Sequence, residues 1–155
     1  MKLNDKIHHR TKLRHCIVEM LKAEDSLMDV QIFCNRTAPV HEEVLPCILV
    51  RSDSERMDEQ YSMDYGGRSR TTTITIECRV AEKSGDDVAD KLAMTVEQAL
   101  YKNPRLSGLV FASKFVSTEF SFSMQGELPI YAVNLNFEFE YLTEYDPDDA
   151  REINA

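Results

Sequence analysis

The sequence has little glycine or proline, no long apolar run and no visible secretory signal, and each absence argues against a class of protein. Five glycines and five prolines among 155 residues are too few for a collagenous or low-complexity chain. No apolar run approaches the roughly 20 residues that a membrane-spanning helix needs. The first residues are charged and polar, without the apolar segment of a secretory signal, so we expect a cytoplasmic protein without a membrane partner.

Motifs for metal binding and catalysis are also missing. The four cysteines, Cys16, Cys34, Cys47 and Cys78, form no CxxC pair and lie among apolar residues, so we interpret them as small buried hydrophobic residues. No GxSxG, P-loop, GxGxxG or Cys/His signature is present. We therefore predict that the chain is not an enzyme and binds no cofactor.

Three histidines crowd the expected first helix without the spacing of a metal site. His8 and His9 are followed four residues later by Lys12 and Leu13, whereas a helix that binds a metal normally places a second histidine there. We predict no metal site and interpret the histidines as solvated or interface residues.

Charge is divided unevenly along the chain. The formal net charge is -9; residues 1–80 contain 12 Lys/Arg and 13 Asp/Glu, whereas residues 81–155 contain 6 and 14. An acidic surface repels a polyanion, so we expect no tight binding of nucleic acid. The exception is the first 22 residues, with six basic and two acidic side chains.

The hydrophobic pattern predicts two helices and five strands in one domain that spans residues 1–143. Apolar residues recur at helical spacing over 5–22 and 84–102, and they alternate with polar residues in strands near 71–80, 110–124 and 131–141. Shorter apolar runs predict strands at 30–33 and 44–50, the second kinked or placed at an edge by its proline. This order predicts an α+β fold, in which two helices pack on one face of a mostly antiparallel β-sheet.

Two polar segments are predicted to lie outside the regular elements. Residues 144–155 form an acidic C-terminal tail, and residues 51–70 form a long flexible loop. The loop is either disordered or an arm that orders against a partner; tyrosine and methionine are enriched in interface cores, which favours the arm. Its candidate interface residues are Met57, Tyr61, Met63, Tyr65, Arg68 and Arg70.

Two further stripes are candidates for protein contact. Lys6, Arg10 and Arg14 step by four along the first helix, away from its apolar face, and form either a solvated face or a docking surface for an acidic partner such as a neighbouring copy. Such a head-to-tail contact closes into a ring when its rotation allows. The second stripe is the polar face of the last strand: Asn134, Asn136, Glu138 and Glu140.

The order of these segments resembles phage tail terminator proteins, the minor tail protein U family of lambda-like long-tailed phages. Residues 32–55 read IFCNRTAPVHEEVLPCILVRSDSE, with an apolar pair before an arginine, a proline-containing loop, and Leu45-Pro46 before an apolar strand. The segments TITIECRV, DDVADKLAMTVEQAL and FEFEYLTE then follow in the same order as in that family.

The resemblance implies a subunit of a hexameric ring that caps the tail tube, stops its polymerisation and provides the surface for head attachment. The partners would be further copies, the major tail tube protein and a head-completion or connector protein. The protein would assemble in the host cytoplasm, from a phage or prophage, and remain at the head-proximal end of the tail in the virion. DNA would pass through the ring, so we expect a lumen poor in Lys and Arg.

Three other interpretations stay open from the sequence. The chain could be another head–tail joining or tail completion protein, or a monomeric adaptor that binds through residues 51–70. It could also be a small cytoplasmic enzyme in which Glu138 and Glu140, two apart on one strand face, carry acid–base chemistry.

Overall fold

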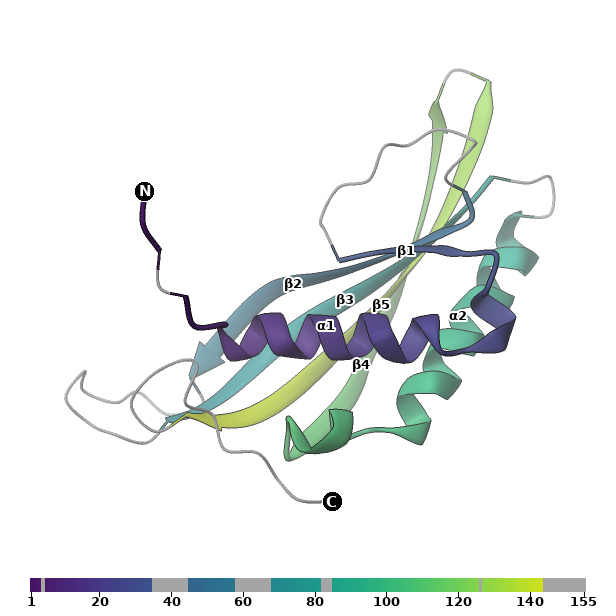
Figure 1. Ribbon diagram of the computed structural model, residues 1–155. Helices are drawn as coiled ribbons and strands as arrows, with labels where there is room; N and C mark the ends of the chain where they lie inside the picture. Colours follow the sequence, from purple (N-terminus) through teal and green to yellow (C-terminus); the bar gives the residue numbers. More distant parts are fainter. Residues whose placement is uncertain (4, 35–44, 58–67, 82–84, 126, 144–155) are drawn as a thin grey trace.

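A five-stranded sheet with two helices on one face forms the body of the protein, which confirms the predicted α+β fold (Figure 1). The computed structural model describes residues 1–3, 5–34, 45–57, 68–81, 85–125 and 127–143. The helices are α1 (His9–Lys22) and α2 (Gly85–Lys102). The strands are β1 (Gln31–Phe33), β2 (Cys47–Met57), β3 (Arg68–Val80), β4 (Ala112–Gln125) and β5 (Leu128–Thr143).

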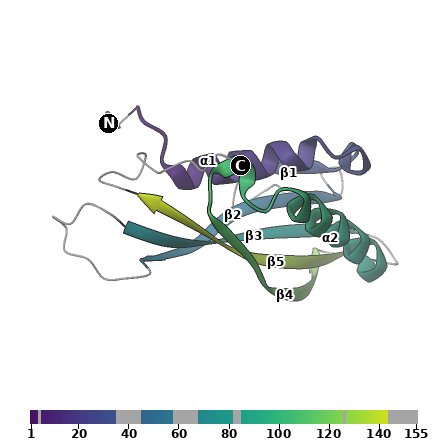
Figure 2. The same cartoon turned by 90° about the horizontal axis from the view of Figure 1, so that it is seen from below.

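The strands follow the order β1-β2-β3-β5-β4, and the β1–β2 pair is parallel whereas the other three pairs are antiparallel. Two short 3-10 turns, η1 (Asp25–Leu27) and η3 (Leu106–Gly108), follow the two helices. Seen from below, both helices lie on the same side of the sheet, and the other side carries no helix in the described part of the chain (Figure 2).

The core forms where the helices meet alternate residues of the central strands. Leu13 and Ile17 of α1 and Val96 of α2 are fully buried, and they pack in one cluster with Ile76 of β3 and Leu135 of β5. Burying each aliphatic side chain of this kind contributes about 1.5–3 kcal/mol. The helical and alternating apolar patterns therefore fold together into one core.

The strand register decides which residues share a face. β3 pairs with β5 without interruption from Arg68 opposite Thr143 to Val80 opposite Tyr131. β2 and β4 each contain one irregularity, at residues 53 and 116. Such an extra residue reverses the alternation beyond it on its own strand but leaves the partner's unchanged.

The predicted loop at 51–70 is wrong for the residues that the structure describes. Residues 51–57 continue β2, and residues 68–70 begin β3. At this end, the β2–β3 hairpin has polar side chains on both faces, because one face contacts α1 through charged groups and the other carries no helix. The alternation of apolar and polar residues that marks a strand is therefore missing there. Residues 58–67, which include Tyr61, Met63 and Tyr65, and the predicted tail 144–155 lie outside the described residues.

Two element boundaries depend on local groups. α1 begins at His9 rather than at residue 5, because the Nδ1 atom of His8 accepts a hydrogen bond from the backbone N–H of Arg10 at 3.0 Å and caps the helix. β2 begins directly after Pro46, whose peptide bond with Leu45 is cis. No helix among the described residues has the length and hydropathy needed to span a membrane.

The cysteines are free thiols that belong to the packed interior. Cys47 and Cys78 are buried, as predicted, whereas Cys16 and Cys34 are half-buried. Burial raises the pKa of the Cys47 thiol to about 11, and it raises that of Cys78 still further.

Gly85 offers a test of how α2 packs on the sheet. A Cβ atom at this position would lie 2.0 Å from Cδ2 of Tyr131. Gly85→Ala should therefore lower the free energy of unfolding by about 1–3 kcal/mol, although the same change in an open helix is stabilising. Chemical denaturation measures this difference. Gln98→Ala at an exposed site of the same helix is the matched control, and a stability gain in Gly85→Ala would contradict this packing.

Candidate functional site

A single carboxylate, that of Glu55, connects the start of α1 with strands β3 and β5. Its Oε2 accepts hydrogen bonds from Arg10 Nη1 at 2.6 Å and from Arg70 Nη1 at 3.2 Å, while Oε1 accepts one from the hydroxyl of Tyr141. Arg70 also donates to Thr143 Oγ1 at 3.2 Å. We call these five residues the Glu55 cluster. Hydrogen bonds between charged groups are roughly twice as strong as neutral ones, so the cluster fixes the helix to this end of the sheet.

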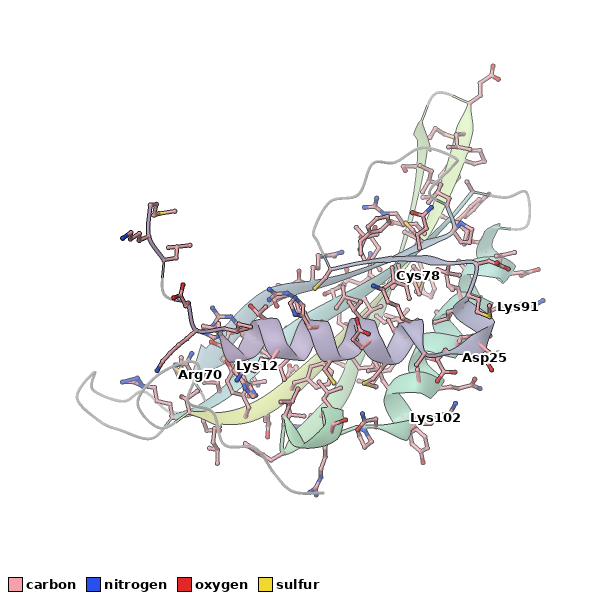
Figure 3. All side chains as sticks on the ribbon, in the orientation of Figure 1. Lys12, Asp25, Arg70, Cys78, Lys91 and Lys102 are labelled. Atoms are coloured by element: carbon pink, nitrogen blue, oxygen red, sulfur yellow. The ribbon has the colours of Figure 1, made fainter. Side chains whose placement is uncertain are left out.

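The Glu55 cluster is largely shielded from water. The side chains of Glu55 and Arg70 are 11% and 9% exposed, and Figure 3 shows Arg70 at the end of the sheet nearest to the start of α1. Burial, followed by the hydrogen bond to Glu55, raises the pKa of Tyr141 well above its usual range. Arg70 therefore belongs to the fold and is not the exposed interface residue that the sequence predicted.

The predicted basic stripe on α1 is also bound to the fold in part. Arg14 Nη1 donates to Ser52 Oγ at 2.9 Å, as Arg10 does to Glu55. These two residues are bonded to β2, which extends beneath them, and their role in a subunit interface stays a prediction. Lys6 lies exposed before the helix, and its role in a subunit interface stays a prediction.

Two of the clustered histidines, His8 and His9, form contacts within the fold. His9 is buried, and its Nε2 atom donates to the carbonyl oxygen of Leu109 at 2.7 Å. Its ring lies 4.6 Å from that of Tyr141. His8 caps α1, and burial, followed by the charge of Arg10, lowers its pKa. Among the described residues, no group of three metal-ligating side chains comes together.

The open sheet face, which we define as the side of β2–β5 turned away from the helices, carries paired charges. Arg51 Nη1 donates to Glu77 Oε1 at 2.8 Å, and its Nε donates to Asp53 Oδ1 at 3.2 Å. Arg79 donates to the second carboxylate oxygen of Glu77. The arginines here therefore stand beside carboxylates and do not form an uncompensated positive patch.

The predicted polar stripe of β5 lies on this open sheet face. Asn136 accepts a hydrogen bond from Thr75 Oγ1 at 2.6 Å and donates to Ser117 Oγ at 3.0 Å, which links β3, β5 and β4. Asn134 Oδ1 is buried and has no hydrogen-bond partner within the described ranges. The four residues share one face as predicted, and their role in protein contact stays a prediction.

Glu138 and Glu140 share the open sheet face but have different neighbours. Glu138 Oε2 accepts a hydrogen bond from Arg56 Nη2 at 3.2 Å. Glu140 lies two residues further along β5, opposite Thr71 and Ala112. This arrangement favours an ion-paired surface over acid–base chemistry.

An apolar surface along β4 was not predicted as an interface. Its residues, which we call the β4 edge surface, are Phe115, Val116, Phe120, Phe122 and Met124, and each is between 45% and 72% exposed. β4 is the outermost strand on one side of the sheet, and no described strand pairs with its outer edge. In the sequence, Phe120, Phe122 and Met124 alternate with serines. This alternation predicts that the strand has an apolar side, but it does not show whether another element covers that side.

Two grooves run between α2 and the β4 edge surface. One, of about 430 Å³, is lined by Asp86, Phe120, Phe122 and Tyr131. The other, of about 300 Å³, lies between Tyr101 near the end of α2 and the strands β4 and β5. Their linings combine aromatic side chains with a few charged groups, a composition typical of protein interfaces.

Comparison with known proteins gives a fold relationship. No family model matches the sequence, and no curated protein matches it. Among solved structures, the fold is similar to a chain of "Virion of native gene transfer agent (GTA) particle", with a TM-score of 0.56 and 15% sequence identity. The alignment covers 83% of this chain and 92% of that chain. At this identity the likeness shows a shared fold over nearly the whole neighbour.

The Glu55 cluster predicts a large effect for a small substitution. Glu55→Gln leaves the two guanidinium groups without their carboxylate, so the free energy of unfolding should fall by about 2 kcal/mol. Chemical denaturation of the variant beside Glu19→Gln, an exposed carboxylate on α1, provides the comparison. Equal stability of the two variants would contradict the role assigned to the cluster.

The helix cap predicts a pH dependence of stability. The pKa of His8 is lowered in the folded chain, so the unfolded chain binds more protons as the pH falls through 6.5. The free energy of unfolding should therefore decrease between about pH 7.5 and pH 5, and His8→Asn, which keeps a capping side chain but does not titrate, should reduce this decrease. His15→Asn at an exposed site is the control; an unchanged pH profile in His8→Asn would rule out this contribution.

Proposed function

We propose that the chain is a structural protein of a phage-like virion and acts as a tail terminator. The observation that carries this proposal is the shared fold with a chain of a gene transfer agent virion particle, which covers 92% of that neighbour. The likeness extends over 83% of this chain rather than one common motif. The sequence pattern of residues 7–145, which resembles the tail terminator family in the order of its segments, favours the finer assignment.

The surfaces of the subunit suit a ring. The β4 edge surface lies on the outermost strand, whereas the basic N-terminal segment precedes α1. Two different surfaces on one chain allow a head-to-tail contact, which closes into a ring when the rotation between copies is right. We propose six copies in that ring, with the tail tube on one side and a head-completion or connector protein on the other.

The paired charges of the open sheet face suit contact with passing DNA. Free Lys and Arg side chains bind phosphates and release counterions, so a lumen lined with them would hold the DNA. Arg51, Arg56 and Arg79 each stand beside a carboxylate instead. We propose that this face, whose arginines are paired with carboxylates, is compatible with a channel. Assembly would take place in the host cytoplasm, and the protein would stay at the head-proximal end of the tail.

Tube capping is the test of this proposal. The purified protein, added to polymerising tail tube protein of the same phage or prophage, should shorten the tubes and leave a ring at one end. Electron microscopy measures the tube lengths with and without the protein, and an equal amount of an unrelated acidic protein is the control. A length distribution that the protein does not change would contradict the tail terminator assignment.

A further inference from the structure

We propose that the N-terminal arm, residues 1–7 of one copy, adds as an extra strand to the outer edge of β4 in a neighbouring copy. This inference deepens the proposed function, because it names the contact that would join subunits in the ring. The pairing itself can be measured on the isolated protein.

The acceptor is the outer edge of β4. Its inner edge pairs with β5, and the register is regular from Ser117 to Gln125, beyond the irregularity at Val116. An exposed edge strand with apolar side chains offers unpaired N–H and C=O groups to another strand, and natural proteins usually protect such edges with charges or a cover. Between 117 and 125 this edge has a single charged residue, Glu119.

An apolar stripe follows the same edge. Phe120, Phe122 and Met124 lie on the helix side of β4, opposite Val133, Tyr131 and Pro129 of β5, and they are 72%, 58% and 53% exposed. Three neighbouring apolar side chains on one strand face, all more than half exposed, are unusual on a surface that meets only water. A strand added beside β4 would cover their outer sides.

The N-terminal arm has the matching pattern. Met1, Leu3 and Ile7 stand at odd positions, interrupted by Asp5, and are 108%, 73% and 52% exposed, whereas Lys2 and Lys6 stand at even positions. Successive side chains of a strand point to opposite faces. The arm, extended as a strand, would therefore present an apolar face of the same period as the stripe on β4.

The charges of the arm also favour the orientation in which its apolar residues face the helix side of β4. With the apolar residues of the arm against the helix side, Lys2 and Lys6 would lie on the open sheet side, where Glu119 is exposed on β4. Asp5 would share the apolar side, where the outermost strand stays partly open to water. The basic arm and the acidic second half of the chain thus complement each other.

The geometry favours pairing between copies. The chain before α1 lies at one end of the molecule, whereas the β4–β5 hairpin protrudes at the opposite end (Figure 1). Contact of one copy's arm with the next copy's edge uses two different surfaces. It is therefore heterologous and can be repeated around a ring.

Complementation between two variants tests this contact. The arm variant, Leu3→Asp/Ile7→Asp, and the edge variant, Phe120→Ser/Met124→Ser, change exposed residues only, so both should fold as judged by circular dichroism. Sedimentation velocity over a concentration series should show self-association of the unmodified chain, weakened more than about tenfold in each variant alone. An equimolar mixture should form a 1:1 complex and no larger species, because it contains one intact arm–edge pair. Met28→Ser, which removes an exposed apolar side chain elsewhere, should associate as the unmodified chain does.

The results that would contradict the arm–edge contact can be told apart from those that would contradict the tail terminator function. A mixture that stays monomeric, or an unmodified chain that is monomeric at every concentration, overturns the arm–edge contact. Loss of association in the edge variant alone would instead mean that two β4 edges pair with each other. An arm variant that still caps tail tubes at full strength would overturn this contact and leave the tail terminator function standing, whereas arm–edge pairing without any tube capping would do the reverse.

Discussion

The uninterrupted antiparallel pairing of β3 with β5 is the constraint on which the rest of the structure depends. Thirteen consecutive residue pairs, from Arg68–Thr143 to Val80–Tyr131, keep the alternation of both strands in phase. Every second residue therefore turns to the helices and every other one to the open sheet face. A shift by one residue would bury the polar set and expose the apolar set, so the register defines both the core and the surface.

The two ends of the sheet are held by different interactions. Where α1 begins, the Glu55 cluster links the helix to β2, β3 and β5 through charge-assisted hydrogen bonds. Under α2, the contact is apolar and includes the close approach of Gly85 to Tyr131. α2 still leaves the β4 edge surface uncovered. One end of the molecule is thus held by charged groups that pair within the chain, whereas the β4 edge surface is exposed and available to another chain. This asymmetry suits a subunit whose neighbours repeat the same contact.

The prediction from sequence succeeded for the core and missed several contacts at the surface. The alternation in residues 131–141 and the helical spacing around Val96 are local signals, and both elements formed as expected. Arg10 and Arg14 appeared free because their partners, Glu55 and Ser52, lie about forty residues away in a segment without any strand pattern. Residues 51–57 carry no alternation because neither of their faces meets the apolar core. The β4 edge surface was missed because alternation shows that a strand has an apolar side but not that a helix fails to cover it.

The sequence by itself determined the class of fold, the order of its elements and the residues of its core, because hydrophobic period is a property of neighbouring residues along the chain. Only the tertiary structure decided which charges pair within the chain and which apolar side chains stay exposed. Those outcomes depend on the order of strands in the sheet and on where each helix ends above it. Ion pairs between distant segments and an uncovered edge arise from that arrangement, and it is these features that indicate how copies of the protein meet.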